Sequence, residues 1–391
     1  MPGALQISPV QCRTTSPSSR VAAIVGDSEV WFESDDVALR PSVEAFVSAF
    51  LIPSVAARLR LDATGPVDAA FAASMPKVLD IAHRWWGYNP VLPRFDTWCV
   101  DRDPHSPAAG RTALCFSGGV DSFHTLLASG RKIDDLVFVR GFDMPLADVA
   151  RAEAVEEQVR EIAGVVGARA IIVRTNLRAH PPFRAASWDR THGGALAAVG
   201  HLLAGHADTL LISASFSHKG WHPWGSAWQL DPLWSGNGLT VEHIGAELNR
   251  AEKLRVLRDE PLVRRHLRVC WENRTEALNC SRCEKCIRNQ VVLGGLGVLE
   301  HFRVFEPPAT LAARVDQVAR IRDPQVFARY EFALAMGGLT PQAALAVREL
   351  LARSKRAMWR DRVVRAHEYL GAVARRVMRG RRLDASSPRA E

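Results

Sequence analysis

Short runs of apolar residues alternate with amphipathic segments through the middle of the chain. The runs are nearly continuous in apolar residues, as are the strands of a sheet that is buried on both faces. They cover residues 112–116, 135–142, 168–176 and 208–216. Segments with helical spacing of apolar positions lie between them, among them 150–167 and 193–205. The alternation predicts an α/β fold with a mostly parallel, doubly wound sheet and helices on both of its faces.

The residues before this region follow another pattern. The first 20 residues are rich in Ser, Pro and Thr, which predicts a disordered start. The segment Arg20–Val30 predicts a strand with a Gly-Asp turn, and residues 42–60 and 66–87 have the apolar spacing of helices, the former interrupted by a proline. A Pro-rich stretch after residue 100 is typical of a linker. We therefore expect an N-terminal α+β domain over residues 1–108.

The remainder of the chain is predicted to be mainly helical. Residues 239–258 have helical spacing, and residues 308–383 form a series of predicted helices. We place the central α/β domain over residues 109–300 and a C-terminal, helical and basic segment over residues 301–391.

Composition places the chain among ordinary globular proteins. Of its 391 residues, 47% are hydrophobic and 24% are charged, which excludes wholesale disorder. No apolar run approaches the about 20 residues of a membrane span, and the N-terminus lacks the apolar core of a signal peptide. We therefore expect a cytoplasmic protein without membrane partners. Seven cysteines, an odd number, argue against a disulfide framework.

The net charge of +8 lies in one part of the chain. Residues 341–383 contain 12 Lys and Arg and three acidic residues, a net charge of +9, so the rest of the chain sums to −1. We interpret this segment as a solvated helix face. Docking of RNA, of an acidic partner or of another subunit, including a homodimer, is the alternative. Nucleic-acid binding by the α/β domain is not expected.

The segment Leu114–Ser122 carries the strongest chemical signal. A predicted strand runs into Ser-Gly-Gly-Val-Asp-Ser, and a helix is predicted from about Ser122. Two glycines let the backbone turn sharply and approach a ligand, and the amide groups at a helix N-terminus attract phosphate. Ser117 and Ser122 add hydroxyl donors, and Asp121 suits Mg²⁺ held against phosphate. A glycine turn capped by Asp or Ser, without a ligand, is the alternative.

This motif resembles the PP-loop of the ATP pyrophosphatases, the adenine nucleotide alpha-hydrolase group. The resemblance implies a HUP/Rossmann-like sheet and cleavage of ATP between its α- and β-phosphates, with Asp121 binding Mg²⁺. It also implies a set of pyrophosphate-binding residues in the loop: Ser117, Gly118, Gly119, Val120, Asp121 and Ser122. By topology, adenine and ribose would lie near Phe142, Asp143 and Arg174 at the ends of the next strands.

Four of the seven cysteines lie within 17 residues, at Cys270, Cys280, Cys283 and Cys286. Four thiolates at these spacings suit tetrahedral Zn²⁺, so a structural zinc knuckle is predicted, with an iron–sulfur cluster as the rival. A PP-loop followed by four cysteines resembles 7-cyano-7-deazaguanine synthase-like proteins. More distantly, it resembles the ATP-dependent UDP-N-acetylmuramoyl-L-alanyl-L-glutamate epimerase. Both resemblances cover only residues 112–290.

A tryptophan-rich loop, residues 217–238, follows the fourth predicted strand. Ligands bind at the carboxyl ends of parallel strands, so we expect the substrate pocket here. Its predicted lining residues are His218, Trp221, His222, Trp224, Asp231, Arg250 and Glu252. Asp189 and His192, in an earlier loop, are further candidates, but an ordinary loop histidine is the favoured interpretation of His192. Lys219 and Lys253, with Asp121, are the predicted catalytic residues: the lysines would bind a carboxylate or phosphate charge, and Asp231 or Glu252 would act as a base. The alternative is a tryptophan-packed satellite core with solvated charges.

These features predict an enzyme, an adenylate-forming ligase or synthase. It would use ATP and Mg²⁺ to adenylate a carboxylate, or a ring oxygen, of a small molecule or peptide and release pyrophosphate, before ligation, amidation or nitrile formation. Two alternatives stay open: an ATP-dependent epimerase of a carboxylate-bearing cell-wall precursor, and a nucleotide-binding interaction module without turnover.

Overall fold

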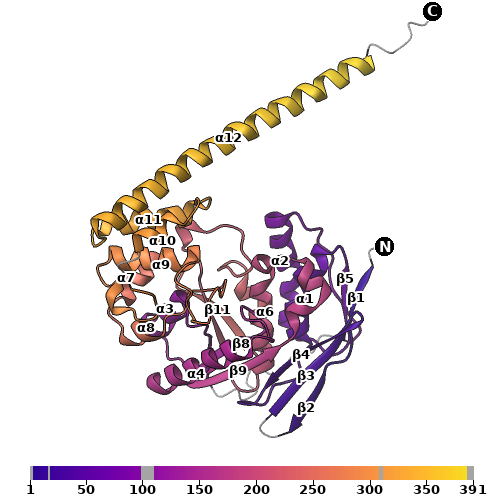
Figure 1. Cartoon of the computed structure of the whole chain (residues 1–391). Coiled ribbons are helices and arrows are strands. Elements are labelled where there is room, and N and C mark those ends of the chain that lie inside the picture. The colour runs from indigo at the N-terminus through magenta and orange to yellow at the C-terminus, as the bar shows by residue number, and fades with distance from the viewer. Residues whose placement is uncertain (1–2, 16–17, 98–109, 308–310, 385–391) are drawn as a thin grey trace, which may run out of the picture. The chain divides into compact units, whose positions relative to one another are not determined.

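The computed structural model describes residues 3–15, 18–97, 110–307 and 311–384, of which 364–384 as backbone only (Figure 1). It divides into two compact units: Met1–Cys286 with His301–Phe305, and Ile287–Glu300 with Glu306–Glu391. These units divide the chain differently from the three predicted domains, because the N-terminal region shares one sheet with the α/β region. The predicted linker after residue 100 lies outside the described residues.

Five parallel strands form one half of the sheet in the first unit. They are β7 (Thr112–Cys115), β8 (Asp135–Arg140), β9 (Arg169–Thr175), β10 (Thr209–Ser213) and β11 (Thr240–Ile244). Their order is β11-β10-β7-β8-β9, and every neighbouring pair is parallel. The chain leaves β7 toward β8 and β9 on one side and returns to β10 on the other, so the connections diverge at the carboxyl ends of β7 and β10. The predicted α/β class with a largely parallel sheet is confirmed.

The N-terminal residues extend this sheet beyond β9 (Figure 1). Their strands are β1 (Ala4–Ile7), β2 (Gln11–Thr15), β3 (Ser18–Val25), β4 (Ser28–Ser34), β5 (Arg60–Ala63) and β6 (Arg94–Phe95). β4 pairs antiparallel with β9, and the order continues β4-β3-β1-β5-β6, with β2 paired to β3. The predicted disorder at the start of the chain is therefore wrong for residues 3–15 and 18–20, the part of that segment that the structure describes. Leu5 and Ile7 are buried, and β2 pairs with β3 through five residue pairs.

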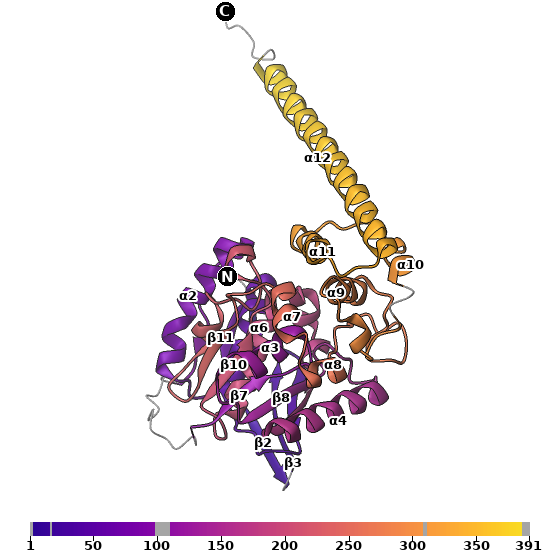
Figure 2. The ribbon, with the colours of Figure 1, turned by 90° about the vertical axis from the view of Figure 1, so that its left-hand side faces the viewer.

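Helices cover both faces of the sheet, and Figure 2 shows α2 and α4 on opposite sides of its parallel strands. The long helices are α1 (Val43–Ala56), α2 (Ala69–Trp86), α3 (Val120–Ala128), α4 (Val149–Val166) and α6 (Trp188–Leu203). Helix α1 continues through Pro53, so the predicted interruption is wrong; residues 43–55 are all buried. It packs tightly along α6, where a Cβ on Gly194 would lie only 2.2 Å from Ser48 O.

Short helices complete the first unit. They are η1 (Leu177–Ala179), α5 (Pro181–Ala185), η2 (His218–Gly220), η3 (Asp231–Trp234), α7 (Arg250–Leu257) and α8 (Pro261–His266). The helix predicted over residues 239–258 is wrong in its first part, because Thr240–Ile244 is strand β11. The helix begins only at Arg250, after the N-cap Asn249.

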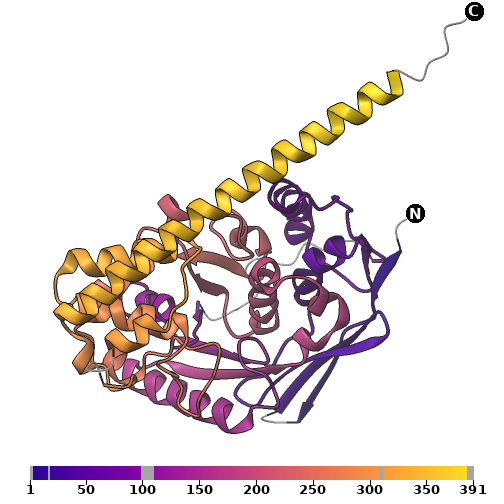
Figure 3. The same ribbon diagram turned by 45° about the horizontal axis from the view of Figure 1, so that its top comes forward.

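The second unit is helical. Its elements are α9 (Glu284–Gly295), η4 (Leu299–His301), α10 (Leu311–Asp316), α11 (Pro324–Met336) and α12 (Pro341–Asp384). The first residues of α9 and the last residue of η4 belong to the first unit. Tyr330 of α11 and Val347 and Leu350 of α12 are fully buried. Figure 3 shows α12, in yellow, as one continuous helix. Arg353 of α12 donates to carbonyls at the end of α10, including Val318 O at 2.7 Å.

No helix among the described residues combines the length and the apolar character that crossing a bilayer requires.

Candidate functional site

The glycine loop, Ser117–Gly119, joins β7 to α3. Gly118 has a φ of +72°, in the left-handed region that favours glycine. Gly119 is the N-cap of α3 and brings no capping side chain, and the Phe123 amide donates to its carbonyl at 3.0 Å. A helix start without a side-chain cap offers its first amide groups to an anion. The loop therefore has the geometry of an anion cradle.

The side chains of this loop have different surroundings. Ser122 is buried, and its hydroxyl donates to Gly119 O at 3.1 Å. Val120 is also buried. Ser117 is half-buried, and its hydroxyl makes no hydrogen bond with the described residues. Of the two predicted hydroxyl donors, Ser117 is thus the one that a ligand can engage.

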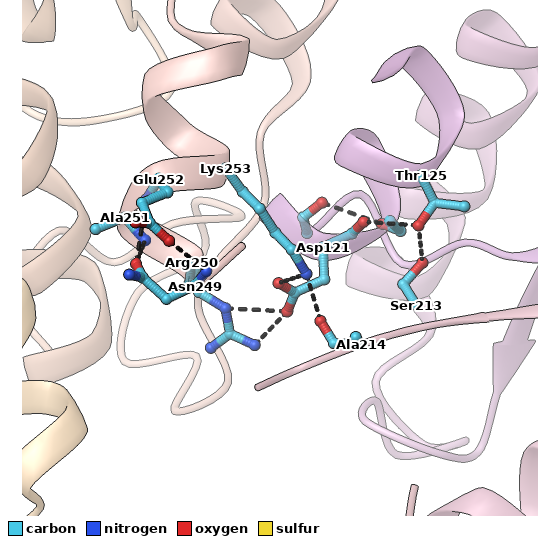
Figure 4. A network of polar contacts seen from close by, with 11 residues as sticks. Asp121, Thr125, Ser213, Ala214, Asn249, Arg250, Ala251, Glu252 and Lys253 are labelled. Carbon is cyan, nitrogen blue, oxygen red and sulfur yellow. Dashed lines mark hydrogen bonds and ion pairs between the residues drawn. The ribbon is translucent and has the colours of Figure 1, made fainter. Parts of the chain in front are cut away.

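Asp121, in the first turn of α3, faces two cations from α7 (Figure 4). Arg250 Nε donates to Asp121 Oδ2 at 3.0 Å, and Arg250 Nη2 makes a second contact with the same oxygen. Lys253 Nζ lies 3.3 Å from Asp121 Oδ1. A capping box between Asn249 and Glu252 fixes the start of α7, so the two cations, three residues apart, share one helix face. Glu252, predicted for the pocket, has this capping role.

Lys253 is the most deeply buried of these charged groups. Its side chain is 1% exposed, and its Nζ also donates to Ala214 O at 2.6 Å, just beyond β10. Burial lowers the pKa of Lys253; Asp121 opposes this shift and Arg250 reinforces it. His124 lies one turn further along α3. Burial lowers its pKa too, and its Nδ1 has no hydrogen-bond partner among the described residues.

The ion-pair cluster lies where the chain connections diverge. Ser213, the last residue of β10, donates to Thr125 Oγ1 of α3 at 2.8 Å and so ties the end of β10 to the helix after the glycine loop (Figure 4). Open α/β sheets bind their ligands in this position, outside the carboxyl ends of the strands. The structure thus brings together the predicted residues Asp121, Arg250 and Lys253 beside the glycine loop.

The residues predicted for adenine and ribose have different environments. Arg174 lies on β9 and pairs with Glu33 at 2.8 Å and Asp35 at 2.6 Å, so it links β9 to the N-terminal strands. Phe142 packs against Trp188 just beyond β8. The charge of Asp143 acts on Arg268. Burial of the Arg268 guanidinium lowers its pKa, and Asp143 opposes this shift. Arg174 is therefore engaged by acidic residues of the N-terminal region, whereas Phe142 and Asp143 follow the carboxyl end of β8.

Aromatic rings from the start of α6 and from the segments after β8 and β10 contact one another in a row. Phe142 contacts Trp188, Trp188 contacts His192, and His192 contacts Trp224, with ring centroids 5.2 to 5.8 Å apart. Trp224 then packs against Phe216, just beyond β10, at 5.2 Å. Burial lowers the pKa of His192. The rings form a connected wall from residues that follow β8, begin α6 and follow β10.

Two further tryptophans of the loop are more exposed, whereas Trp234 is fully buried. Trp221 and Trp228 are 38% and 43% exposed, with ring centroids 6.5 Å apart, and His218 packs against Trp228. His222 packs against both Phe216 and Trp224 and so joins the aromatic row. Lys219, predicted to be catalytic, is exposed and makes no ion pair with the described residues.

Asp231 is fully buried and forms a separate polar group. Ser226 Oγ and His243 Nδ1 donate to its Oδ2 at 2.6 and 2.7 Å, while its Oδ1 has no partner among the described residues. Gly193 lies against this carboxylate, because a Cβ there would be 2.9 Å from Oδ1. Burial and Asp231 together raise the pKa of the Cys115 thiol to about 12. Sequence reasoning placed Asp231 in the pocket but missed the bond to His243, because β11 was predicted to be helical.

The four clustered cysteines come together as a candidate metal site. Their sulfur atoms all lie within 4.8 Å of one another and are buried. The Cys270–Cys283 and Cys280–Cys286 sulfur distances are both 3.9 Å, close to the about 3.8 Å expected for four sulfurs around Zn²⁺. Backbone amides donate to three of the sulfurs, and hydrogen bonds from Cys283 and Cys286 lower the pKa of Cys270. The site can hold a metal such as zinc.

No protein-family model matches this chain, and neither a curated protein nor a solved structure matches it. Function is therefore inferred from the residues and their geometry.

Proposed function

We propose that the chain is an ATP-dependent, adenylate-forming enzyme that binds its nucleotide at the glycine loop. A carboxylate, or a ring oxygen, of a small molecule or peptide attacks the α-phosphorus of ATP. The new bond joins that oxygen to the α-phosphorus, the bond from the α-phosphorus to the oxygen bridging to the β-phosphorus breaks, and pyrophosphate leaves. The resemblance of residues 117–122 to the PP-loop supports this choice of bond.

The observation that carries the proposal is the contact of Arg250 and Lys253 with Asp121, two residues after the glycine loop, and of Lys253 with Ala214 O just beyond β10. The order β9-β8-β7-β10-β11 supports it, because it corresponds to the 3-2-1-4-5 order of doubly wound, Rossmann-like sheets, which bind nucleotides where the strand order reverses. The amide groups at the start of α3 and two cations give this point the positive charge that a polyphosphate requires.

Each residue of the cluster has a role in this proposal. Arg250 and Lys253 bind phosphate oxygens and stabilise the charge that grows on the leaving pyrophosphate. Asp121 holds both cations in position and supplies the carboxylate oxygen that would bind Mg²⁺. The glycine loop, with the Ser117 hydroxyl, holds the pyrophosphate moiety.

The aromatic row supports a substrate pocket on the same edge of the sheet. Phe142 and Phe216 follow β8 and β10, so the wall they form with Trp224 lies at the carboxyl ends of the strands. Such a wall excludes water from an acyl-adenylate, which water would hydrolyse. The four cysteines are assigned a structural zinc, because four thiolate ligands leave no open position on the metal for a substrate.

The proposal is tested by the products formed from ATP. The protein, Mg²⁺ and ATP are incubated with a panel of carboxylic acids, and AMP, ADP and pyrophosphate are quantified for the wild type, for K253M and for K132M. Lys132 is a matched control, since its side chain is 87% exposed. We expect pyrophosphate, with a matching amount of acyl-adenylate or of AMP formed by its hydrolysis, from the wild type and K132M but not from K253M. Formation of ADP, or ATP binding without turnover, contradicts the proposal, and the second result favours an interaction module.

A further inference from the structure

A short segment, Leu267–Cys270, lies between the glycine loop and the four cysteines. The Arg268 amide donates to Gly118 O at 2.8 Å. A Cβ on Gly118 would lie 3.7 Å from Arg268 Cβ, and a Cβ on Gly119 would lie 3.7 Å from Arg268 O. Both glycines of the loop are therefore in direct contact with this segment.

The guanidinium of Arg268 is buried, and among the described residues Asp143 and Cys270 are the groups whose charges stabilise it. The residue is 7% exposed, its Nε has no hydrogen-bond partner among the described residues, and its Nη1 reaches only Cys270 O, at 3.4 Å. No carboxylate forms an ion pair with it in the described part of the chain. Burial of an unpaired charge is unfavourable, so a buried arginine without an ion pair is expected to face an anion when the protein is at work.

The cysteine region holds this segment in place. Asn279, which precedes Cys280, accepts hydrogen bonds from the amides of Val269 and Cys270 at 2.8 and 3.2 Å. Its Nδ2 donates to Leu267 O at 2.7 Å. One side chain of the cysteine region thus binds three backbone groups of the segment that contacts the glycine loop. Any displacement of that region moves Arg268 relative to Gly118.

We propose that Arg268 is a phosphate-positioning residue of the glycine-loop site and that metal binding by the four cysteines holds it there. The inference rests on the proposed function, since it concerns the polyphosphate of the same nucleotide. Arg268 is joined to the loop through Gly118 O, whereas Arg250 and Lys253 act at Asp121. The two sites are then coupled: bound metal raises the affinity for ATP, and bound ATP raises the affinity for the metal by the same factor.

The test compares R268Q and R268K with the wild type and with R151Q. Arg151 is a matched control: its side chain is 11% exposed and donates to Thr275 O at 2.9 Å and to Ala277 O at 3.1 Å, beside the cysteines, without contact to the glycine loop. The equilibrium affinity for Mg-ATP is measured by calorimetry, and the bound metal by elemental analysis. We expect R268Q to keep its metal and to bind ATP about tenfold more weakly, as for a lost hydrogen bond to a charged group. R268K should be intermediate, and R151Q unchanged.

Four results overturn all or part of the inference. If R268Q binds ATP as tightly as the wild type, Arg268 does not position the phosphates. The same conclusion follows if R268Q loses ATP affinity only in proportion to the metal that the same sample has lost. Metal-depleted wild type that keeps its circular dichroism spectrum and its ATP affinity removes the coupling. A wild type that binds no ATP overturns the inference together with the proposed function, whereas the other results leave that function standing.

Discussion

Asp121 and Asp231 each lie at the centre of a polar cluster in the first unit, and the side chains that contact them differ in kind. Asp121 faces the cations Arg250 and Lys253. Asp231 faces a hydroxyl and an imidazole, and one of its oxygens has no partner in the described part of the chain. Arginine and lysine held by a partly exposed carboxylate can be shared with an anionic ligand, whereas donors around a fully buried carboxylate satisfy the hydrogen bonds of that group. The first cluster is therefore suited to binding and the second to holding the fold.

The largest expected effect on stability comes from Asp231. Substitution D231A leaves the Ser226 hydroxyl and the His243 ring buried without their acceptor, which should lower the free energy of unfolding by about 3 kcal/mol. The measurement is urea unfolding followed by fluorescence. ATP affinity of the folded fraction should stay unchanged. A D231A protein that is as stable as the wild type but has lost ATP binding would place Asp231 in the ligand site and reverse the comparison.

At Lys253 we expect a large loss of activity with little change in stability. Substitution K253M removes a cation that stabilises charge on the leaving pyrophosphate, so pyrophosphate release should fall about 100-fold. Stability should change by less than about 1 kcal/mol, because an apolar side chain of similar length replaces a largely desolvated charge. Product assays and urea unfolding of the same samples measure both. Loss of stability with activity retained would give Lys253 a structural role instead.

A smaller effect, on the pH dependence of stability, is expected from His124 and His192. Burial lowers the pKa values of His124 and His192 below the ordinary value of 6.5. Below pH 6.5 the unfolded chain therefore binds protons that the folded chain does not, so stability decreases as the pH falls, by up to about 1.4 kcal/mol per pH unit for each histidine. Melting temperatures between pH 5 and 8 test this. H192N should have a shallower dependence; an unchanged slope would exclude His192 as a source.

The features that could be predicted from the sequence are those that depend on residues close together in the chain. Strands β7 to β10 begin and end within a few residues of the predicted apolar runs, because strands covered on both faces need apolar side chains throughout. The cysteines at positions 280, 283 and 286 were predicted to converge, because two-residue spacings close tight turns.

The elements that could not be predicted depend on contacts between distant residues. Strand β11 contains Glu242 and His243, which interrupt its apolar pattern, and its pairing with β10 decides its conformation. The same is true of β2, whose exposed residues form a strand only by pairing with β3. In the site, the role of Arg268 had no sequence signal beyond its place two residues before Cys270.

The central claim is that a nucleotide binds at the glycine loop with Arg250 and Lys253. Titration of the purified protein with Mg-ATP, for the wild type and K253M in parallel, tests it most directly. We predict saturable binding by the wild type and at least about tenfold weaker binding by K253M, since a hydrogen bond to a charged group contributes on this scale. Equal affinities of the two proteins, or no binding by the wild type at millimolar ATP, would contradict the account.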